Sequence, residues 1–233
     1  MSNIRINLIP LFKKLEKESY CVIKLPENFP NYDVGSDLDF FCYNVEKIAK
    51  IILGYLQSNI SADLTIVISN IGKQIYIDIM DKRNIHFRFD LYGSLPTYRK
   101  VSIKGAFFSS VIEGSKEVNK SNCIVKVPKL IDESILRYIE YQEWFSERPD
   151  KIKHVNYLEE KINNSELELN GALDKLHYYI SVPRVKDDDE KRNTSNSVQY
   201  MQYLFGIFKK VVKYIQLHGI KKTIYKIKDS LLK

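Results

Sequence analysis

The sequence predicts an α+β fold, in which a small mixed β-sheet is followed by a helical C-terminal half. Strand-like segments gather around one helical segment in the first 92 residues, whereas helical spacing of apolar residues dominates after residue 123. Of the 233 residues, 44% are hydrophobic and 28% are charged, as in ordinary globular proteins. This composition excludes a wholly disordered chain, a collagen and a coiled-coil array.

Residues 4–18 predict a short amphipathic helix, which Pro10 interrupts early. Segments rich in β-forming residues then predict four or five strands, over 19–24, 37–43, 64–69, 74–80 and 84–92. Residues 44–58, between the second and third strands, predict a helix with Asn44 as its N-cap. Asn70, Ile71 and Gly72 predict a hairpin turn between the third and fourth strands.

The last of these strands alternates between apolar and polar residues. The two expected faces consist of Ile85, Phe87, Phe89 and Leu91 on one side and His86, Arg88, Asp90 and Tyr92 on the other. Asp90, between Phe89 and Leu91, is therefore a candidate functional residue rather than an ordinary solvent-exposed acid.

Helical segments follow over residues 131–146, 151–163 and 166–180. We expect four regions: an α+β domain over 1–122, a helical region packed on it over 123–182, an exposed polar linker over 183–197 and a basic amphipathic helical tail over 198–233.

The net charge of +7 belongs to the C-terminal tail. From Gly206 onward the chain holds eight lysines and one acidic residue, Asp229, so the rest of the chain carries no net charge. This asymmetry argues against a nucleic-acid-binding body and for a basic appendage.

The cysteines and the apolar runs indicate the compartment. Cys21, Cys42 and Cys123 are widely spaced and odd in number, which indicates neither a disulfide framework nor a zinc site. No apolar run approaches the length of a membrane-spanning helix, and the N-terminus lacks the features of a signal peptide. We therefore expect a soluble protein of a reducing cytoplasm.

A pair of carboxylates begins the second predicted strand. Asp37 and Asp39 lie two residues apart and project from one face of that strand, while Leu38 and Phe40 face the core. Hard divalent cations need such oxygen ligands on a rigid element. Asp90, on the polar face of the last strand, is the expected third carboxylate of a two-metal site for phosphoryl or nucleotidyl transfer.

The spacing alone is a weak signal, because Asp187 and Asp189 repeat it in the polar linker. Asp78 in the fourth strand competes with Asp90 as the third carboxylate, and we prefer Asp90 for its flanking residues. The structural alternative is that Asp37 and Asp39 cap a turn and that Asp90 lies at a solvated edge.

Residues 35–41, Gly-Ser-Asp-Leu-Asp-Phe-Phe, and 87–92, Phe-Arg-Phe-Asp-Leu-Tyr, resemble motifs of the DNA polymerase beta-like nucleotidyltransferase superfamily. More narrowly, they resemble bacterial members encoded among surface-polysaccharide genes. The resemblance covers roughly residues 15–110. It implies a small mixed sheet that presents Asp37, Asp39 and Asp90 as ligands of two Mg²⁺ ions, with Mn²⁺ as an alternative. It also implies that Asp90 helps to deprotonate the acceptor hydroxyl.

The sequence departs from that superfamily in its phosphate-binding segment. The superfamily usually has a Gly-Ser pair that opens a helix well before its Asp pair, whereas here Gly35 and Ser36 abut the Asp pair. Residues 24–33 contain two prolines and no glycine-rich cradle. The candidates for phosphate or substrate contacts are therefore Lys24, Gly35, Ser36 and Arg88.

Several other residues have two interpretations. Arg88 contacts either phosphate or a cross-strand acid. The residues for which we favour a structural or solvated role over ligand binding are His86, Lys100, Lys104, Trp144, His154 and His177.

The tail predicts a basic amphipathic helix that lies on an anionic membrane. Ile220, Ile224, Ile227 and Leu231 form an apolar face. The lysines expected at the headgroups are Lys209, Lys210, Lys213, Lys221, Lys222, Lys226 and Lys228. Each contributes about 1 kcal/mol near such a surface. The alternative is a helix packed on the domain with its lysines in water.

Together these expectations describe an Mg²⁺-dependent nucleotidyltransferase-type enzyme of bacterial surface-polysaccharide synthesis. Its donor would be a nucleotide or a phosphorylated small molecule, and its acceptor a sugar or polyol. We expect it in the cytoplasm, peripherally at the inner face of the membrane, and we do not expect nucleic acid as a partner. The alternatives are an inactive, membrane-tethered scaffold of the same fold and an RNA- or protein-modifying enzyme of toxin–antitoxin type.

Overall fold

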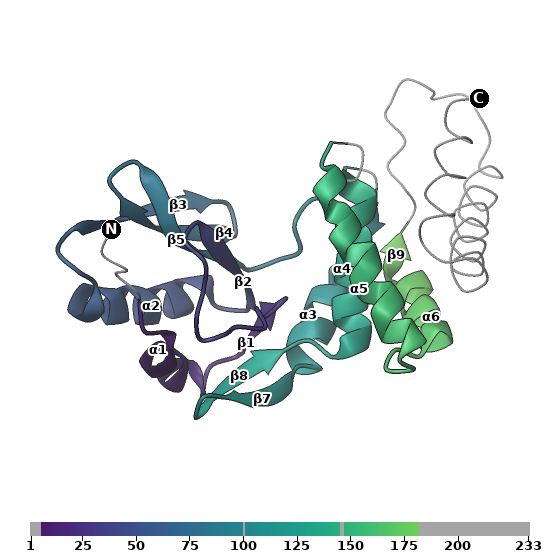
Figure 1. The fold of residues 1–233 in the computed structure, drawn as a ribbon. Helices are drawn as coiled ribbons and strands as arrows, with labels where there is room; N and C mark the ends of the chain where they lie inside the picture. The colour runs from purple at the N-terminus through teal and green to yellow at the C-terminus, as the bar shows by residue number, and fades with distance from the viewer. Residues whose placement is uncertain (1–5, 100, 145–146, 182–233) are drawn as a thin grey trace, which may run out of the picture.

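The computed structural model describes residues 6–99, 101–144 and 147–181 (Figure 1). Within these ranges the chain combines a five-stranded sheet, two short two-stranded sheets and six α-helices. The predicted α+β class and the mainly helical C-terminal half are thereby confirmed. The linker over 183–197 and the tail over 198–233, with its eight lysines and its expected membrane face, lie outside the described residues.

The central sheet is mixed and has the strand order β1-β2-β5-β4-β3. Its strands are β1 (Tyr20–Ile23), β2 (Ser36–Cys42), β3 (Leu64–Ile71), β4 (Gln74–Asp81) and β5 (Asn84–Tyr92). Only β2 and β5 pair in parallel; the other neighbours in this sheet are antiparallel. The five strands expected from the sequence are all present.

Helices α1 (Leu8–Leu15) and α2 (Val45–Asn59) close one face of this sheet. Asn44 caps α2, since its side-chain oxygen accepts a hydrogen bond of 2.9 Å from the amide of Lys47. The helices and the strands together form a first hydrophobic core. It includes Leu11, Phe12 and Ile52 of the helices and Leu38, Phe40, Phe87 and Phe89 of the strands. Burial of these side chains is the main stabilising contribution of this half.

Two details of the sheet differ from expectation. The β3–β4 turn lies at residues 72–73 rather than 70–72, and Gly72 adopts the positive φ of 61° that a tight hairpin requires. A bulge interrupts the β4–β5 ladder, where Met80 pairs with Ile85 but Ile79 pairs with Phe87. His86, at the bulge, is therefore buried against Tyr32 of the first core, with 3.1 Å between its Nε2 and the hydroxyl.

A second core lies beyond the other face of the sheet, at the β1–β2 edge (Figure 1). Cys21, Ile23 and Phe41 meet helices α3 (Ala106–Glu113), α4 (Leu130–Trp144) and α6 (Leu169–Tyr179) there. The remaining elements are a 3-10 turn (Pro149–Lys151), α5 (Ile152–Asn163), and the short strands β6 (Ser102–Ile103) and β9 (Ile180–Ser181). Within the described residues these helices cover only one end of that face, and the remainder, which we call the open face, carries partly exposed residues such as Tyr76 and Asp78.

A hairpin between the two halves was not predicted. Strands β7 (Lys116–Lys120) and β8 (Cys123–Val127) pair through a turn at Ser121 and Asn122, both of which have positive φ. The hairpin crosses the division that we expected at residue 122. The four-region organisation stays a prediction.

Cys21, Cys42 and Cys123 are all buried, free thiols. Among the described residues, no helix combines the length and apolar character that crossing a membrane requires.

Candidate metal centre

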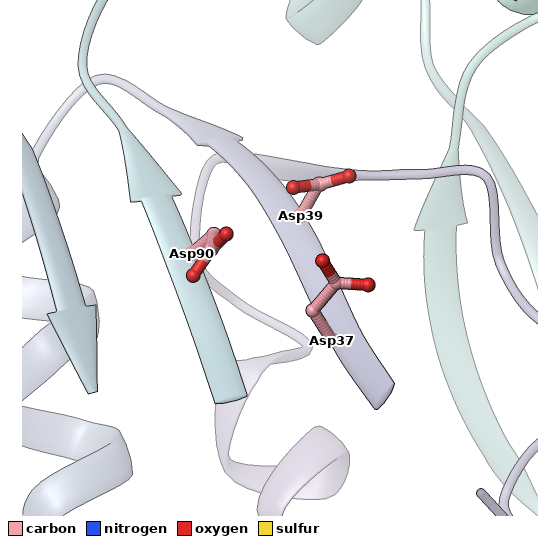
Figure 2. Close-up of side chains that lie close together, drawn as sticks. All are labelled: Asp37, Asp39 and Asp90. Carbon is pink, nitrogen blue, oxygen red and sulfur yellow. The ribbon is translucent and has the colours of Figure 1, made fainter. Parts of the chain in front are cut away.

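Three aspartates meet on the open face of the sheet (Figure 2). Leu38 and Phe40 of β2 are buried in the first core, so alternation directs Asp37 and Asp39 to the opposite face. Phe89 and Leu91 of β5 are buried in the same core, so Asp90 between them lies on the opposite face as well. Because β2 and β5 run in parallel, Asp39 pairs directly with Asp90 in the ladder.

The geometry of this triad (Asp37, Asp39 and Asp90) fits a divalent cation. One carboxylate oxygen from each residue lies within 4.8 Å of those of the other two. Two oxygens that share a cation at about 2.1–2.5 Å are separated by at most about 5 Å. Asp90 Oδ1 is buried and makes no hydrogen bond, so its lone pairs are free for a ligand. Among the described residues this is the one group of three potential metal ligands.

Burial and mutual repulsion make the carboxylates of Asp39 and Asp90 harder to ionise. Burial and then the charge of Asp39 raise the pKa of Asp90 to about 7. Burial also raises the pKa of Asp39, to about 6, with Lys24 opposing and Asp37 reinforcing the shift. In the absence of a cation, ionised carboxylates at this site repel one another, and a bound divalent ion would relieve that repulsion.

Arg88 makes the cross-strand ion pair that was one of its two expected roles. It lies opposite Asp78 in the β4–β5 ladder, and its Nη2 donates to Asp78 Oδ2 at 3.0 Å while its Nε donates to Oδ1. Its Nε also lies 3.7 Å from Asp90 Oδ1. Asp78, the rival third carboxylate, is therefore engaged by Arg88 and is not a member of the triad.

Lys24 lies beside the triad and is already engaged. It follows β1 with φ of 57°, a left-handed conformation that is costly for a residue other than glycine. Its Nζ pairs with Glu140 of α4 and lies 3.7 Å from Asp39 Oδ2. Burial acts to lower the pKa of Lys24, but the charges of Asp39 and Glu140 outweigh it, so that the ammonium stays charged.

Glu140 was not predicted as a site residue. Its carboxylate also pairs with Lys151 and lies 3.4 Å from Nε2 of the buried His154. Burial acts to raise the pKa of Glu140, but the contacts with His154, Lys24 and Lys151 outweigh it and hold the pKa well below its usual range. No sequence pattern marks Glu140 as a site residue, because it is one of several acidic residues in an ordinary helical segment.

Gly35 and Ser36 use their backbone amides inside the protein. The Gly35 amide donates to the carbonyl of His86 at 2.9 Å, and the Ser36 amide donates to the carbonyl of Asp33 at 3.0 Å. Ser36 lies opposite Phe87 in the ladder, on the core side of β2, and its hydroxyl has no hydrogen-bond partner. The structure thus does not bring the Ser36 side chain to the triad, and a phosphate-binding role for either residue stays a prediction.

The loop before β2 is anchored in the first core rather than shaped as an anion cradle. Phe29 and Tyr32 are both buried, and the Tyr32 hydroxyl accepts a hydrogen bond of 2.7 Å from the amide of Ile6. The amides of Phe29 and Asn31 donate to carbonyls within the loop. These contacts fix the entry of the chain into β2 and hence the position of Asp37.

Three tyrosines border the triad. Burial, reinforced by Asp39, raises the pKa of Tyr92, and burial, reinforced by Asp90, raises the pKa of Tyr76. Tyr98 is affected in the same way by Glu140 and Asp39. These hydroxyls stay protonated at neutral pH, and that of Tyr76 donates a hydrogen bond of 2.6 Å to Gln74 Oε1.

The other residues with two interpretations lie away from the triad. Lys104 donates to the carbonyl of Tyr178, and Arg99 stacks over the ring of Trp144. His177 is an exposed residue of α6. Lys100 lies outside the described residues.

Comparison of the chain with known protein families, with curated proteins and with solved structures gives no match.

Proposed function

We propose that the chain is an Mg²⁺-dependent nucleotidyltransferase-type enzyme. It would transfer a nucleotidyl or related phosphoryl group to a sugar or a phosphorylated small molecule in bacterial surface-polysaccharide synthesis. The observation that carries the proposal is the convergence of Asp37, Asp39 and Asp90 within 4.8 Å on one sheet face. The resemblance of residues 35–41 and 87–92 to the polymerase beta-like superfamily supplies the reaction class and the polysaccharide context.

In this proposal the triad holds two Mg²⁺ ions, or Mn²⁺. The ions, when bound, would stabilise the negative charge that develops on the transferring phosphoryl group. The acceptor oxygen bonds to phosphorus as the bond to the leaving phosphate group breaks. We assign the hydroxyl proton to Asp90, the carboxylate that the resemblance to the superfamily implies for this role and that lies in the triad.

The neighbouring side chains complete the proposed site. Tyr92 and Tyr98 supply protonated hydroxyls for a polar acceptor such as a sugar or polyol. Arg88, which already neutralises Asp78, contributes positive charge close to Asp90. We propose nucleoside triphosphates as the donors to test first.

An inactive scaffold of the same fold is the second candidate. The observation that favours it is the loop before β2, whose amides at Phe29, Asn31, Gly35 and Ser36 all donate within the protein. A chain without a phosphate cradle could bind a metal and yet lack turnover.

The test of activity uses the full chain with Mg²⁺ or Mn²⁺, a panel of nucleoside triphosphates, and sugar and polyol acceptors. We expect pyrophosphate release that falls at least a hundredfold in Asp37→Ala/Asp39→Ala. The control is Asp63→Asn, which changes an exposed aspartate outside the triad. Metal binding without turnover with any donor would favour the scaffold.

Membrane association through the tail is a separate part of the proposal. We expect the full chain to sediment with anionic vesicles, since seven of the eight lysines of its tail are expected opposite an apolar face. Replacement of these lysines by glutamine should abolish sedimentation. Equal binding by both proteins, or equal binding to neutral vesicles, would refute the tail as an electrostatic anchor.

A further inference from the structure

Ion pairs on either side of the triad connect it to β4 and to the helical half. From β4 to the 3-10 turn the charged groups are Asp78, Arg88, Asp90, Asp39, Lys24, Glu140 and Lys151, with Asp37 beside them. Five of these groups are carboxylates and three are cations. The excess of negative charge lies at the triad, where the ion pairs of Asp39 and Asp90 are each 3.7 Å long and do not reach hydrogen-bonding distance.

Lys24 is the cation best placed to cancel that excess, yet it forms only a long ion pair with Asp39 and no hydrogen bond. Its Nζ lies 3.7 Å from Asp39 Oδ2, which is beyond hydrogen-bonding distance. Its contact partner is Glu140, which reaches it from α4 across 116 positions of sequence. Asp39 therefore keeps its oxygens available.

Glu140 is itself held in place. Lys151 pairs with its second oxygen, and buried His154 lies 3.4 Å from that oxygen. Its carboxylate therefore cannot leave Lys24 without also breaking contacts to the 3-10 turn and to α5.

Resting on the proposed metal site, we propose that Glu140 is a positioning residue that holds Lys24 away from Asp39 and so keeps the triad open to a divalent cation. Without Glu140, the ammonium of Lys24 moves onto Asp39 and competes with the metal for its oxygens. Lys24 in its present position reduces the repulsion among the carboxylates without occupying them.

The test is a double-mutant cycle on Mn²⁺ binding by the full chain, measured by calorimetry. Glu140→Asp keeps the charge but withdraws the carboxylate by about 1.5 Å, and Glu140→Gln removes the charge. We expect each to raise the Kd for Mn²⁺ at least tenfold. Adding Lys24→Met should restore Kd to within about threefold of the Lys24→Met single variant. Glu133→Gln is the matched control, since it removes a charge from α4 where the partner is Arg137, and should change Kd less than twofold.

A purely long-range effect of charge gives a different result. In that case Lys24→Met changes Kd by the same factor with and without Glu140, and Glu140→Asp leaves Kd unchanged. Either outcome overturns the proposal. Glu140→Asp also guards against misfolding, because it retains a carboxylate for Lys151.

Crystal structures of the metal-free protein separate this inference from the proposed function. We expect Lys24 Nζ to lie within about 3.2 Å of an Asp39 oxygen in Glu140→Asp. If the wild-type chain binds no Mn²⁺, the proposed function fails, but this movement of Lys24 still tests the role of Glu140. Lys24 that stays in place overturns it.

Discussion

The two faces of the five-stranded sheet are formed by alternate residues of the same strands but differ in what covers them. On one face, Phe40 and Phe89 are buried beneath α1 and α2. On the other, Asp39 and Asp90 lie on strand surface that the helices of the second core only partly cover. Neighbouring residues such as Phe89 and Asp90 therefore have opposite effects: Phe89 stabilises the fold by its burial, whereas burial raises the pKa of Asp90, which we propose binds a cation.

The covered face predicts the largest effect on stability. Phe89→Ala removes a fully buried ring and leaves a cavity, so we expect it to lower the free energy of unfolding by about 3–5 kcal/mol. Urea unfolding followed by circular dichroism measures this loss. Phe89→Leu, as a control, should cost less than half as much, and equal losses in both variants would contradict a packing role.

For Asp90 on the open face we expect the opposite effect, in which its replacement raises the free energy of unfolding of the metal-free protein. The pKa of Asp90 is raised from 3.8 to about 7, so the folded state binds more protons than the unfolded state between about pH 4 and pH 7. The stabilising contribution of the neutral carboxyl is present below pH 4 and is lost as the pH rises through 7. Asp90→Asn should therefore stabilise the metal-free protein by about 1–3 kcal/mol at pH 8 and by much less at pH 5.

Urea unfolding of the wild type and Asp90→Asn at pH 5, 6, 7 and 8, in the presence of a chelator, checks this dependence. Only the difference between the two proteins is interpreted, since other groups titrate in the same range. A difference that is constant with pH, or that favours the wild type at pH 8, would show that Asp90 is not a strained acid.

Arg88 lies between Asp78 and Asp90 on the open face, and we expect its loss to change stability less than Asp90→Asn does. Arg88→Met leaves Asp78 and Asp90 without their shared cation, so we expect it to destabilise the fold by about 1–2 kcal/mol at pH 8. The same substitution should raise the pKa of Asp90 further, since Arg88 opposes that shift. Carbon-13 NMR of the aspartate carboxyls follows the pKa, and an unchanged titration of Asp90 would rule out the coupling.

The sheet edge gives the smallest expected effect. Ile68 on β3 is 52% exposed, so Ile68→Thr should change the free energy of unfolding by less than about 0.5 kcal/mol. Ile77→Thr in the adjacent strand is the matched comparison, because Ile77 is fully buried in the first core. Similar losses in the two variants would mean that the β3 edge is covered in solution.

The two faces also differ in how far they can be predicted from sequence. Alternation in β2 and β5 predicts both faces, because the period of two is a local property of a strand. The bulge at His86 is not visible in that pattern, since it depends on the ladder with β4. Strand β8 carried a readable signal in the alternating Cys123, Val125 and Val127, but the turn at Ser121 and Asn122 lacks the glycine that usually marks a tight hairpin.

The residues around the triad were predictable only where they lie on its own strands. Asp37, Asp39 and Asp90 share local context, and the structure brings them together. The contact between Lys24 and Glu140 depends on how the helical half packs on the sheet, which no local pattern encodes. The same holds for Lys151 and His154, which meet Glu140 from separate elements.

The central claim is that the open face of the sheet binds a divalent cation through the triad. Calorimetric titration of Mn²⁺ into the wild type and Asp39→Asn tests it most directly, with Phe40→Leu as the control from the covered face. The account predicts saturable binding by the wild type and by Phe40→Leu, and a loss of at least about thirtyfold in affinity, or about 2 kcal/mol, in Asp39→Asn. Equal affinities in the wild type and Asp39→Asn, or no binding by the wild type, would contradict it.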